Sequence, residues 1–476
     1  MNSMHQKIIL GLTVVLCLGA CSVPKTMQVT ASTNPPAVYT SNKDTSNMVS
    51  IAWNQFFTDP QLVSLIDTAL HNNLDLMMTL QEIEIAKSKV QFASGKLLPT
   101  TTFAMGAGVE KVGRYTSQGA GDASADITPG ETVPEALTDV HIGFQTSWEA
   151  DIWGKLKNAK KSAYTNYLGT VEGKKWVSTN LIAEVANTYY ELVGINNQLA
   201  IINASIELQQ KQLEVVKAQK EAAVVTQLAV KQFEAMVYNA QNIAFNLLQN
   251  KTEAENKLNL LLGRYPQKIQ LGTGFNQALP AAINVGIPSQ LLKNRPDIQQ
   301  AELALTAAKL DVKVAAAEFY PSVNIGANIG LSAFKTKYLF RSPESIMYSL
   351  LSDVAGPLIN KSAIKAEFAT ANAIQIEAAY QFQKSILNGF IEVSNQMSNV
   401  QNLEASFQIK NKEADALTAS VAVSSDLFNY GKANYLEVLT AQRDALAAQL
   451  ELVEIKKQQY SALTNLYKSL GGGWKQ

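Results

Sequence analysis

The sequence predicts a mixed α and β membrane protein that is built from two similar halves. Three observations predict this fold class: a long stretch in which apolar and polar residues alternate, very long helical runs without proline, and an internal sequence repeat. Alternation with a period of two is typical of strands, whereas apolar residues spaced by threes and fours are typical of packed helices.

The alternating stretch covers Val140–Trp153. The apolar residues of one parity are Val140, Ile142, Phe144, Trp148, Ala150 and Ile152. The polar residues of the other parity are His141, Gln145, Ser147, Glu149 and Asp151. Such a strand fits a soluble sheet over a core, or a membrane barrel with lipid outside and water inside. For a barrel, we expect the polar parity, including Glu149 and Asp151, to face a shared lumen.

The second half of the chain repeats the first, initially at a shift of 222 residues. Asp75 and Pro99 match Asp297 and Pro321 at this shift, and Gly263 matches Gly471 at a later shift of 208. The smaller shift places about fourteen additional residues in the loop that follows the first strand. We therefore expect two copies of one plan, each with two strands and an antiparallel pair of long helices.

The helical pattern covers four segments: residues 60–99, 155–263, 289–320 and 360–470. Strands are expected within residues 100–154 and 321–359. Asp59 is a plausible N-cap with Pro60 in the first helical turn, and a turn is expected near Ala222–Thr226. The helix from Lys155 to this turn would be about 100 Å long, so it would project far beyond a bilayer.

The N-terminus predicts export from the cytoplasm. Lys7 precedes a short apolar run, and residues 1–20 have the pattern of a secretory signal peptide. The small residues before Cys21 resemble a bacterial lipobox, in which this cysteine is acylated and becomes the first residue of the mature protein. The alternative is an ordinary signal peptide with an incidental cysteine. Residues 21–59 are then a lipid-anchored tether and an equatorial segment.

Charge and residue usage exclude several functions. The 40 basic residues balance the 40 acidic residues, so there is no basic excess for nucleic acid. After removal of a signal peptide only His71 and His141 remain, so no histidine and cysteine metal site and no histidine-based triad can be assembled. We therefore expect no metal, no cofactor and no catalytic residue.

Several motifs occur in a fixed order along nearly the whole chain. They are Trp148-Glu-Ala-Asp-Ile-Trp-Gly-Lys155, Asn294-Arg-Pro-Asp-Ile298, Phe319-Tyr-Pro-Ser322, Tyr430-Gly431, Ala441-Gln-Arg443 and Leu466–Trp474. This ordered set resembles the outer-membrane factors of the TolC superfamily, specifically the NodT-type lipoproteins of RND efflux pumps.

The resemblance implies a TolC-like homotrimer with a shared twelve-stranded transmembrane β-barrel, continued by a long periplasmic α-helical barrel. Residues 264–288 and 471–476 would form equatorial segments around it. Four strands cannot close a barrel, and an open edge in lipid leaves backbone groups unpaired, so several chains must share one barrel. Strand count alone would also allow a dimer with eight strands.

The implied function is the outer-membrane channel of a tripartite efflux pump in a Gram-negative bacterium, exporting drugs or other small toxic compounds. The implied partners are a periplasmic adaptor (membrane fusion) protein, an inner-membrane RND-type pump and outer-membrane lipid. Ser22 after the acylated cysteine suggests sorting to the outer membrane by analogy with the family. Two alternatives stay open: a duct for type I protein secretion or heavy-metal export, and a structural periplasmic coiled-coil lipoprotein without a pore.

By the same resemblance, the helical turns would contact the adaptor and residues after the second turn would gate the pore. The adaptor-contact candidates are Thr226, Gln227, Gly431 and Asn434. The gate candidates are Leu436, Glu437, Thr440 and Arg443. Thr440 stands where relatives often have an acid, and Ala433 where they often have an arginine. Three copies of Glu437 around a narrow axis would raise one another's pKa, unless Glu437 is simply a solvated helix residue.

Overall fold

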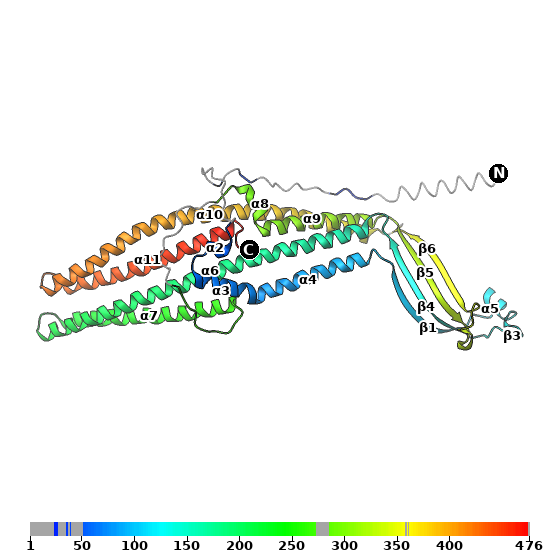
Figure 1. The fold of residues 1–476 in the computed structure, drawn as a ribbon, viewed down its shortest axis with the longest axis horizontal. Helices are drawn as coiled ribbons and strands as arrows, with labels where there is room; N and C mark the ends of the chain where they lie inside the picture. Colours follow the sequence, from blue (N-terminus) through cyan, green and yellow to red (C-terminus); the bar gives the residue numbers. More distant parts are fainter. Residues whose placement is uncertain are drawn as a thin grey trace. The chain divides into compact units, whose positions relative to one another are not determined.

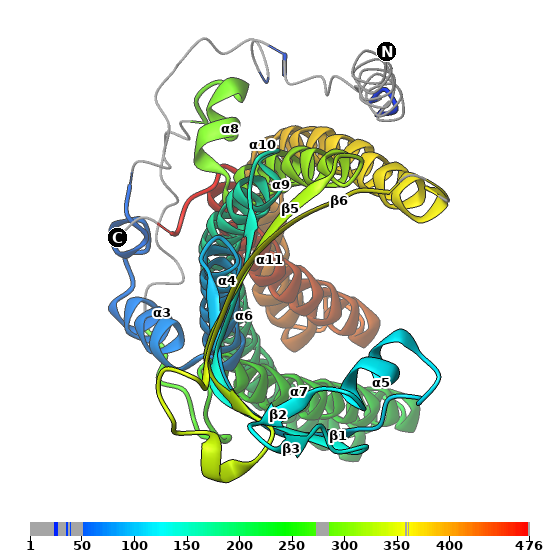
Figure 2. The ribbon, with the colours of Figure 1, turned by 90° about the vertical axis from the view of Figure 1, so that its right-hand side faces the viewer.

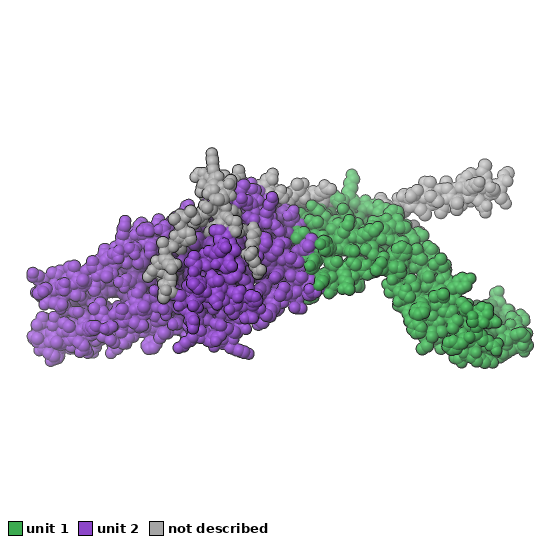
Figure 3. Space-filling model, viewed as in Figure 1, with its two compact units in different colours: residues 1–30, 85–167, 303–379 green, residues 31–84, 168–302, 380–476 purple. Residues whose placement is uncertain are grey.

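The computed structural model describes residues 23–26, 35–36, 39, 51–272, 285–357, 359 and 361–474. The expected signal peptide, Cys21, most of the tether and residues 273–284 lie outside this range. The chain divides into two compact units, shown in Figure 3. Unit 1 contains residues 85–167 and 303–379, and unit 2 contains residues 51–84, 168–302 and 380–474.

Unit 1 contains a four-stranded antiparallel sheet in the order β1-β4-β5-β6 (Figure 1). Its strands are β1 (Thr100–Glu110), β4 (Leu137–Ala150), β5 (Ser322–Ala333) and β6 (Ile346–Ala355). Strand β4 pairs with β1 on one side and with β5 on the other, so the two repeats meet in the middle of the sheet. Strands β1 and β6 are the two edges.

The predicted strand end at Trp153 is wrong, because β4 stops at Ala150. The carboxylate of Asp151 accepts hydrogen bonds from the backbone N–H groups of Leu156 and Lys157, both at 2.9 Å. These two groups belong to the first turn of α6, where N–H groups have no partner within the helix. Asp151 therefore caps the helix and is not part of the polar face of the strand.

The loop between β1 and β4 contains structure that we did not predict. Helix α5 (Ser117–Asp122) is followed by a small hairpin of β2 (Asp126–Thr128) and β3 (Glu131–Thr132). Thr116 caps α5 by accepting a hydrogen bond from the N–H of Gly119 at 3.1 Å. The additional residues of the first repeat thus lie in a folded loop.

Four long helices form two antiparallel hairpins, α6 with α7 and α10 with α11 (Figure 1). They are α6 (Lys155–Glu221), α7 (Gln227–Leu261), α10 (Ser362–Asn429) and α11 (Tyr435–Ser469). An apolar stripe of α6 is buried in unit 2, with Val185, Tyr189 and Leu192 fully covered. Within the described ranges, no helix is both long enough and apolar enough to cross a bilayer.

The shorter helical segments are broken, contrary to the predicted continuous runs 60–99 and 289–320. A short helix, α2 (Trp53–Phe56), precedes α3 (Pro60–Asn72) and α4 (Leu74–Gly95). In the second repeat a 3₁₀ turn (Pro288–Gln290) and α8 (Leu291–Asn294) precede α9 (Pro296–Ala317). The predicted N-cap Asp59 is confirmed, since its side chain accepts from the N–H of Gln61 at 2.9 Å.

The two breaks fall at equivalent places in the repeat, at Asn73 and Arg295. Both residues are extended, with ψ of 128° and 113°. The Asn73 side chain accepts from the N–H of Leu76 at 3.0 Å, which caps α4. Arg295 precedes Pro296, and a following proline disfavours the helical conformation. A local interaction thus favours each break.

Arg295 is 1% exposed and joins several elements of unit 2. Its guanidinium donates to Asp297 at 2.6 Å and 3.0 Å, to Glu392 at 2.6 Å and to the backbone oxygen of Ser469 at 2.9 Å. It also lies over the ring of Trp176, with 5.0 Å between Cζ and the ring centroid. A buried charge is tolerated when it is paired and hydrogen-bonded in this way. Arg295 therefore holds α9, α10, α11 and α6 together.

Candidate gate at the helical turns and the two faces of the sheet

The two helical hairpins end in turns with the same backbone geometry. Ala223 in the first turn and Gly431 in the second are 208 residues apart, the shift of the repeat, and have φ of 59° and 68°. Among the described residues, Ala223 is the only residue other than glycine with positive φ. A left-handed residue here lets the chain leave one helix and enter the next within a few residues.

The first turn exposes the two adaptor-contact candidates that it contains. Thr226 is the N-cap position of α7 but makes no capping hydrogen bond with its side chain, and Gln227 is the first residue of the helix. Both side chains are exposed. Three ion pairs surround this end of the hairpin, Lys217 with Glu214, Lys220 with Glu221 and Lys231 with Glu234. The hydrogen bond to Glu214 raises the pKa of Lys217, and the hydrogen bond to Glu234 raises that of Lys231.

The second turn is closed by reciprocal capping between Asn434 and Glu437. The Asn434 side chain accepts from the N–H groups of Leu436 at 2.9 Å and Glu437 at 3.2 Å. The Asn434 N–H donates to Glu437 Oε1 at 3.4 Å, which completes a capping box. The carboxylate of Glu437 thus lies at the positive end of the α11 dipole. This structural role was not among those that the sequence suggested.

Three of the four gate candidates line one open groove between α10 and α11, with a volume of about 520 Å³. Leu436, Glu437 and Thr440 lie on its α11 side together with Asp444. Arg443 does not line the groove, but its Nε donates to Asp444 Oδ1 at 2.9 Å. Asp444 was missed by the sequence analysis, although it lies one helical turn after Thr440 and two turns after Glu437. The groove therefore carries two carboxylates on one side.

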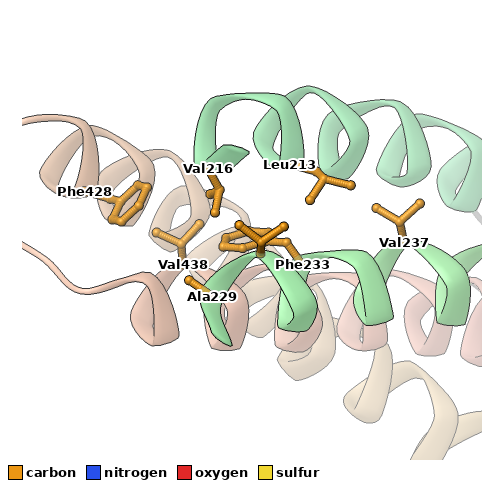
Figure 4. Packing of buried hydrophobic residues seen from close by; sticks show 8 residues of the cluster. Leu213, Val216, Ala229, Phe233, Val237, Phe428 and Val438 are labelled. Carbon is orange, nitrogen blue, oxygen red and sulfur yellow. The ribbon is translucent and has the colours of Figure 1, made fainter. Parts of the chain in front are cut away.

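An apolar cluster joins the two hairpins near their turns (Figure 4). Its buried members are Leu213, Val216, Ala229, Val230, Phe233, Val237, Phe428 and Val438. Phe233 of α7 is at the centre, with Val216 from α6 and Val438 from α11 equally covered. In the described part of residues 213–237 and 426–444, no ion pair connects one hairpin to the other. The hairpins are held together here by burial of apolar side chains.

The sheet of unit 1 has one apolar and one polar face, as the register of the four strands shows. One cross-strand row consists of Phe103, Phe144, Ile329 and Tyr348. All four are exposed, and the rings of Phe103 and Phe144 are 5.6 Å apart. The adjacent row on the other face consists of Thr102, Gln145, Asn328 and Ser349. A wide exposed apolar face opposite a polar one is typical of a strand between lipid and water.

Polar groups gather where β4 passes into α6. Glu149 lies on the polar face opposite Asn324, as its parity predicts, and its carboxylate is 2.6 Å from Lys155 Nζ. Lys155 is also 3.5 Å from Glu318. Partial burial lowers the pKa of Lys155, but the hydrogen bond to Glu149 and the charge of Glu318 outweigh it and raise that pKa overall. Trp153 donates to the backbone oxygen of Pro321 at 2.7 Å and stacks on Tyr320.

A sheet with a lipid-type face and two open edges, combined with long helical hairpins that end in exposed turns, defines the subunit of a membrane channel. The sequence model described as outer membrane efflux protein matches residues 65–264 and 287–472, and the chain belongs to this family. It is an outer-membrane efflux channel and not an enzyme. The expected TolC-like channel fold with two repeated halves, the efflux function and the outer-membrane location are confirmed.

Relatives match over almost the full length. The pyoverdine export outer membrane protein OpmQ of Pseudomonas aeruginosa is 27% identical over 99% of this chain and 98% of its own length. The cation efflux system protein CusC of Escherichia coli is 26% identical over 98% of this chain and 99% of its own length. The solved MtrE outer membrane channel of Neisseria gonorrhoeae superimposes with a TM-score of 0.82 at 21% identity, covering 95% of this chain and 98% of MtrE. At this identity, the similarity shows that MtrE and this chain share a fold.

Proposed function

We propose that three copies of this chain form one channel, which completes a tripartite pump with a periplasmic adaptor and an inner-membrane RND-type pump. The observation that supports this is the strand order, in which β1 and β6 remain as open edges. Unpaired backbone groups are costly in lipid, so β1 of one copy pairs with β6 of the next until the barrel closes. Three copies give twelve strands, an even number within the range of bacterial outer-membrane barrels.

In this arrangement residues 100–154 and 321–359 contribute the β-barrel. Residues 60–99, 155–263, 289–320 and 360–470 contribute the periplasmic α-barrel. The exposed apolar row of the sheet faces lipid, and a diacylglyceryl group on Cys21 anchors the mature N-terminus. The helical turns point away from the membrane into the periplasm. The exposed residues Thr226, Gln227, Gly431 and Asn434 contact the adaptor there.

The groove next to the second turn carries the gate. Leu436, Glu437 and Thr440 of three copies surround the narrow end of the channel, with Asp444 one turn further along α11. Arg443 limits the charge of Asp444 by pairing with it. Rings of carboxylates repel one another, so divalent cations or a low pH favour closure. The apolar cluster around Phe233 keeps the two hairpins of each copy together when the gate is closed.

The exported compounds are small. Relatives of nearly equal length are named for pyoverdine export, cation efflux and toluene efflux. We place drugs and other small toxic compounds in the same class for this chain. The similarity to the CusC cation efflux protein supports metal-ion export as a second candidate.

The deciding experiment is single-channel recording of the purified full-length protein in planar bilayers, with the oligomer mass measured by native mass spectrometry. A trimer that conducts supports the proposal. A protein that stays monomeric and gives no conductance contradicts it, and a conducting dimer contradicts the subunit number. Mass spectrometry of the N-terminal peptide tests the anchor, and a free thiol on Cys21 would exclude it. A deletion strain challenged with antibiotics, solvents and metal salts separates the two substrate classes.

A further inference from the structure

The loop between β5 and β6 gathers three cations around aromatic rings. Lys335, Lys337 and Arg341 share this loop with Phe334, Tyr338 and Phe340. Lys337 Nζ is 4.6 Å and Arg341 Cζ is 5.3 Å from the centroid of the same ring, that of Tyr338. The Phe334 ring is 5.1 Å from the Tyr338 ring. Two cations therefore share one aromatic platform.

Backbone hydrogen bonds fix the shape of this loop. A 3₁₀ turn, η4 (Thr336–Tyr338), is closed by the bond from the N–H of Tyr338 to the oxygen of Lys335 at 3.0 Å. The N–H of Arg341 donates to the oxygen of Tyr338 at 3.0 Å, and the N–H of Ser345 donates to the oxygen of Arg341 at 2.9 Å. The side chains are thus presented by an ordered scaffold, which lowers the entropy that a ligand must remove.

The three cations differ in what they already bind. Lys335 is 2.7 Å from Glu131 of the neighbouring loop, and this hydrogen bond raises the pKa of Lys335. Lys337 and Arg341 are exposed, and no described carboxylate lies within ion-pair distance of either. The charge of Lys337 also acts on Glu131, but the hydrogen bond of that carboxylate goes to Lys335. Two like charges near one ring repel each other, and an anion between them removes this repulsion.

The loop lies at the end of the apolar face of the sheet. The last apolar row before it pairs Leu331 with Ile346, and the row before that contains Tyr348, which is 82% exposed. Phe340 within the loop is 77% exposed. Figure 2 shows that this loop and α5 leave the curved sheet on opposite sides. Exposed aromatic residues followed by basic residues, at the edge of an apolar band, are typical of the boundary between acyl chains and headgroups.

We propose that Lys337 and Arg341 bind a phosphate group of an anionic glycolipid in the outer leaflet of the outer membrane. Arg341 supplies a planar donor fork that suits phosphate oxygens, and Lys337 supplies a second charge. Phe340 and Tyr348 lie against the apolar part of the same lipid. This inference rests on the proposed orientation, in which the hairpin loops are outside the cell and the helical turns are in the periplasm.

The test measures binding of bisphosphorylated lipid A to the full-length protein in lipopolysaccharide-free detergent, by native mass spectrometry. The double variant Lys337→Ala/Arg341→Ala should bind about 30-fold more weakly, on the order of fivefold for each cation removed. Lys335→Ala is the matched control, because it removes a cation of the same loop that is paired with Glu131. It should leave lipid binding close to that of the unmodified protein.

Two further ligands separate the sources of phosphate. Dephosphorylated lipid A should bind the unmodified protein as weakly as bisphosphorylated lipid A binds the double variant, and inorganic phosphate should not compete at millimolar concentration. Equal binding of both lipids, equal binding by the double variant, or competition by inorganic phosphate would each overturn the inference. The double variant should still form conducting channels. Loss of conductance in the unmodified protein would instead count against the proposed function, so the two failures are distinguishable.

Discussion

Arg295 occupies in the second repeat the position of Asn73 in the first, and both side chains bind the end of an equivalent helix. The Asn73 amide donates to the backbone oxygen of Leu261 at 3.0 Å, and the Arg295 guanidinium donates to that of Ser469 at 2.9 Å. Leu261 and Ser469 are also equivalent in the repeat. Arg295 additionally pairs with Asp297 and Glu392, so the second repeat is tied together by charge where the first uses an amide.

Replacing the two residues should therefore have unequal effects. Arg295→Ala leaves carboxylates without their cation and should lower the free energy of unfolding by about 3–5 kcal/mol. Asn73→Ala should cost about 1–3 kcal/mol, the range for a buried hydrogen-bonding group that loses its partner. Denaturant unfolding followed by helical circular dichroism measures both. Lys293→Ala, in the same segment, should change little, and equal losses for the two main variants would contradict the charge-based account.

The two turns offer a matched pair of backbone substitutions. Ala223→Gly should stabilise the first turn by about 1 kcal/mol, because the left-handed conformation is strained for an alanine and not for a glycine. Gly431→Ala should destabilise the second turn by a similar amount, since a Cβ there meets nothing within 4 Å and only the backbone matters. Thermal unfolding and amide hydrogen exchange at the turns would detect both changes. Shifts of the same sign would show that backbone strain is not the cause.

The apolar cluster predicts how the two hairpins separate. Phe233→Ala removes its largest central side chain and should cost about 3–5 kcal/mol of stability, the usual range for a buried phenylalanine. Because the cluster holds α10 and α11 against α6 and α7, the same variant should also raise single-channel conductance. Phe245→Ala is the control, since Phe245 lies on the same helix and is 70% exposed. If conductance stays unchanged while stability falls, the cluster has no part in gating.

Two substitutions at Glu437 separate its charge from its capping role. Glu437→Gln keeps a side chain that can complete the capping box but removes the charge, whereas Glu437→Ala removes both. Because repulsion between the carboxylates opposes closure, both variants should lower the conductance measured without divalent cations and weaken the block by these cations. Current recordings across a pH series and a magnesium series measure this. An effect of Glu437→Ala that Glu437→Gln does not share would assign Glu437 to helix capping alone.

Lys456 predicts a pH dependence of stability. It is 8% exposed, its Nζ lies 5.0 Å from the Phe407 ring and 5.3 Å from the Tyr460 ring, and burial lowers its pKa. Between the lowered value and the ordinary lysine value of 10.5, the unfolded chain binds more protons than the folded one. The free energy of unfolding should therefore rise with pH in that interval. At all lower pH values, the burial of the charged Lys456 side chain reduces this free energy.

Lys456→Met should raise the free energy of unfolding at neutral pH by about 1 kcal/mol and remove this rise. Lys457→Met is the adjacent control, because Lys457 pairs with Glu454 at 2.8 Å near the surface. Unfolding free energies measured from neutral pH to pH 10 give the slope. A Lys456→Met protein with an unchanged slope would show that another group titrates.

Patterns of local origin made most of the elements predictable. The alternation of apolar and polar residues in β4, and the apolar spacing by threes and fours in α6, reflect which face of each element is buried. The sequence repeat extends both patterns to the second half of the chain. The breaks at Asn73 and Arg295 could not be predicted in this way. They depend on hydrogen bonds to Leu261 and Ser469, which are 188 and 174 residues away. From the sequence, Asp151 could be either a polar residue of the strand or a helix cap. The hydrogen bonds that it accepts from N–H groups of α6 show that it is a cap.

The candidate site was predictable in part. The resemblance to known families selected Leu436, Glu437 and Thr440, and the structure places them on one groove. Asp444 joins this site because the helical geometry of α11 places it one turn after Thr440. The cluster around Phe233 combines residues of four helices that are up to 225 residues apart, from Leu213 to Val438, and no pattern within one helix identifies it. The gate and contact roles of these residues remain predictions.

The open edges of the sheet also bear on how the channel reaches the membrane. If several copies share one barrel, as proposed, a solitary chain would insert with the hydrogen-bonding groups of β1 and β6 facing hydrocarbon, and insertion becomes favourable only when copies meet. The rate of insertion should then rise more steeply than linearly with the concentration of chains that have not yet inserted. A cell that halves the synthesis of this protein would lose more than half of its new channels, and export capacity would respond to gene dosage as a threshold.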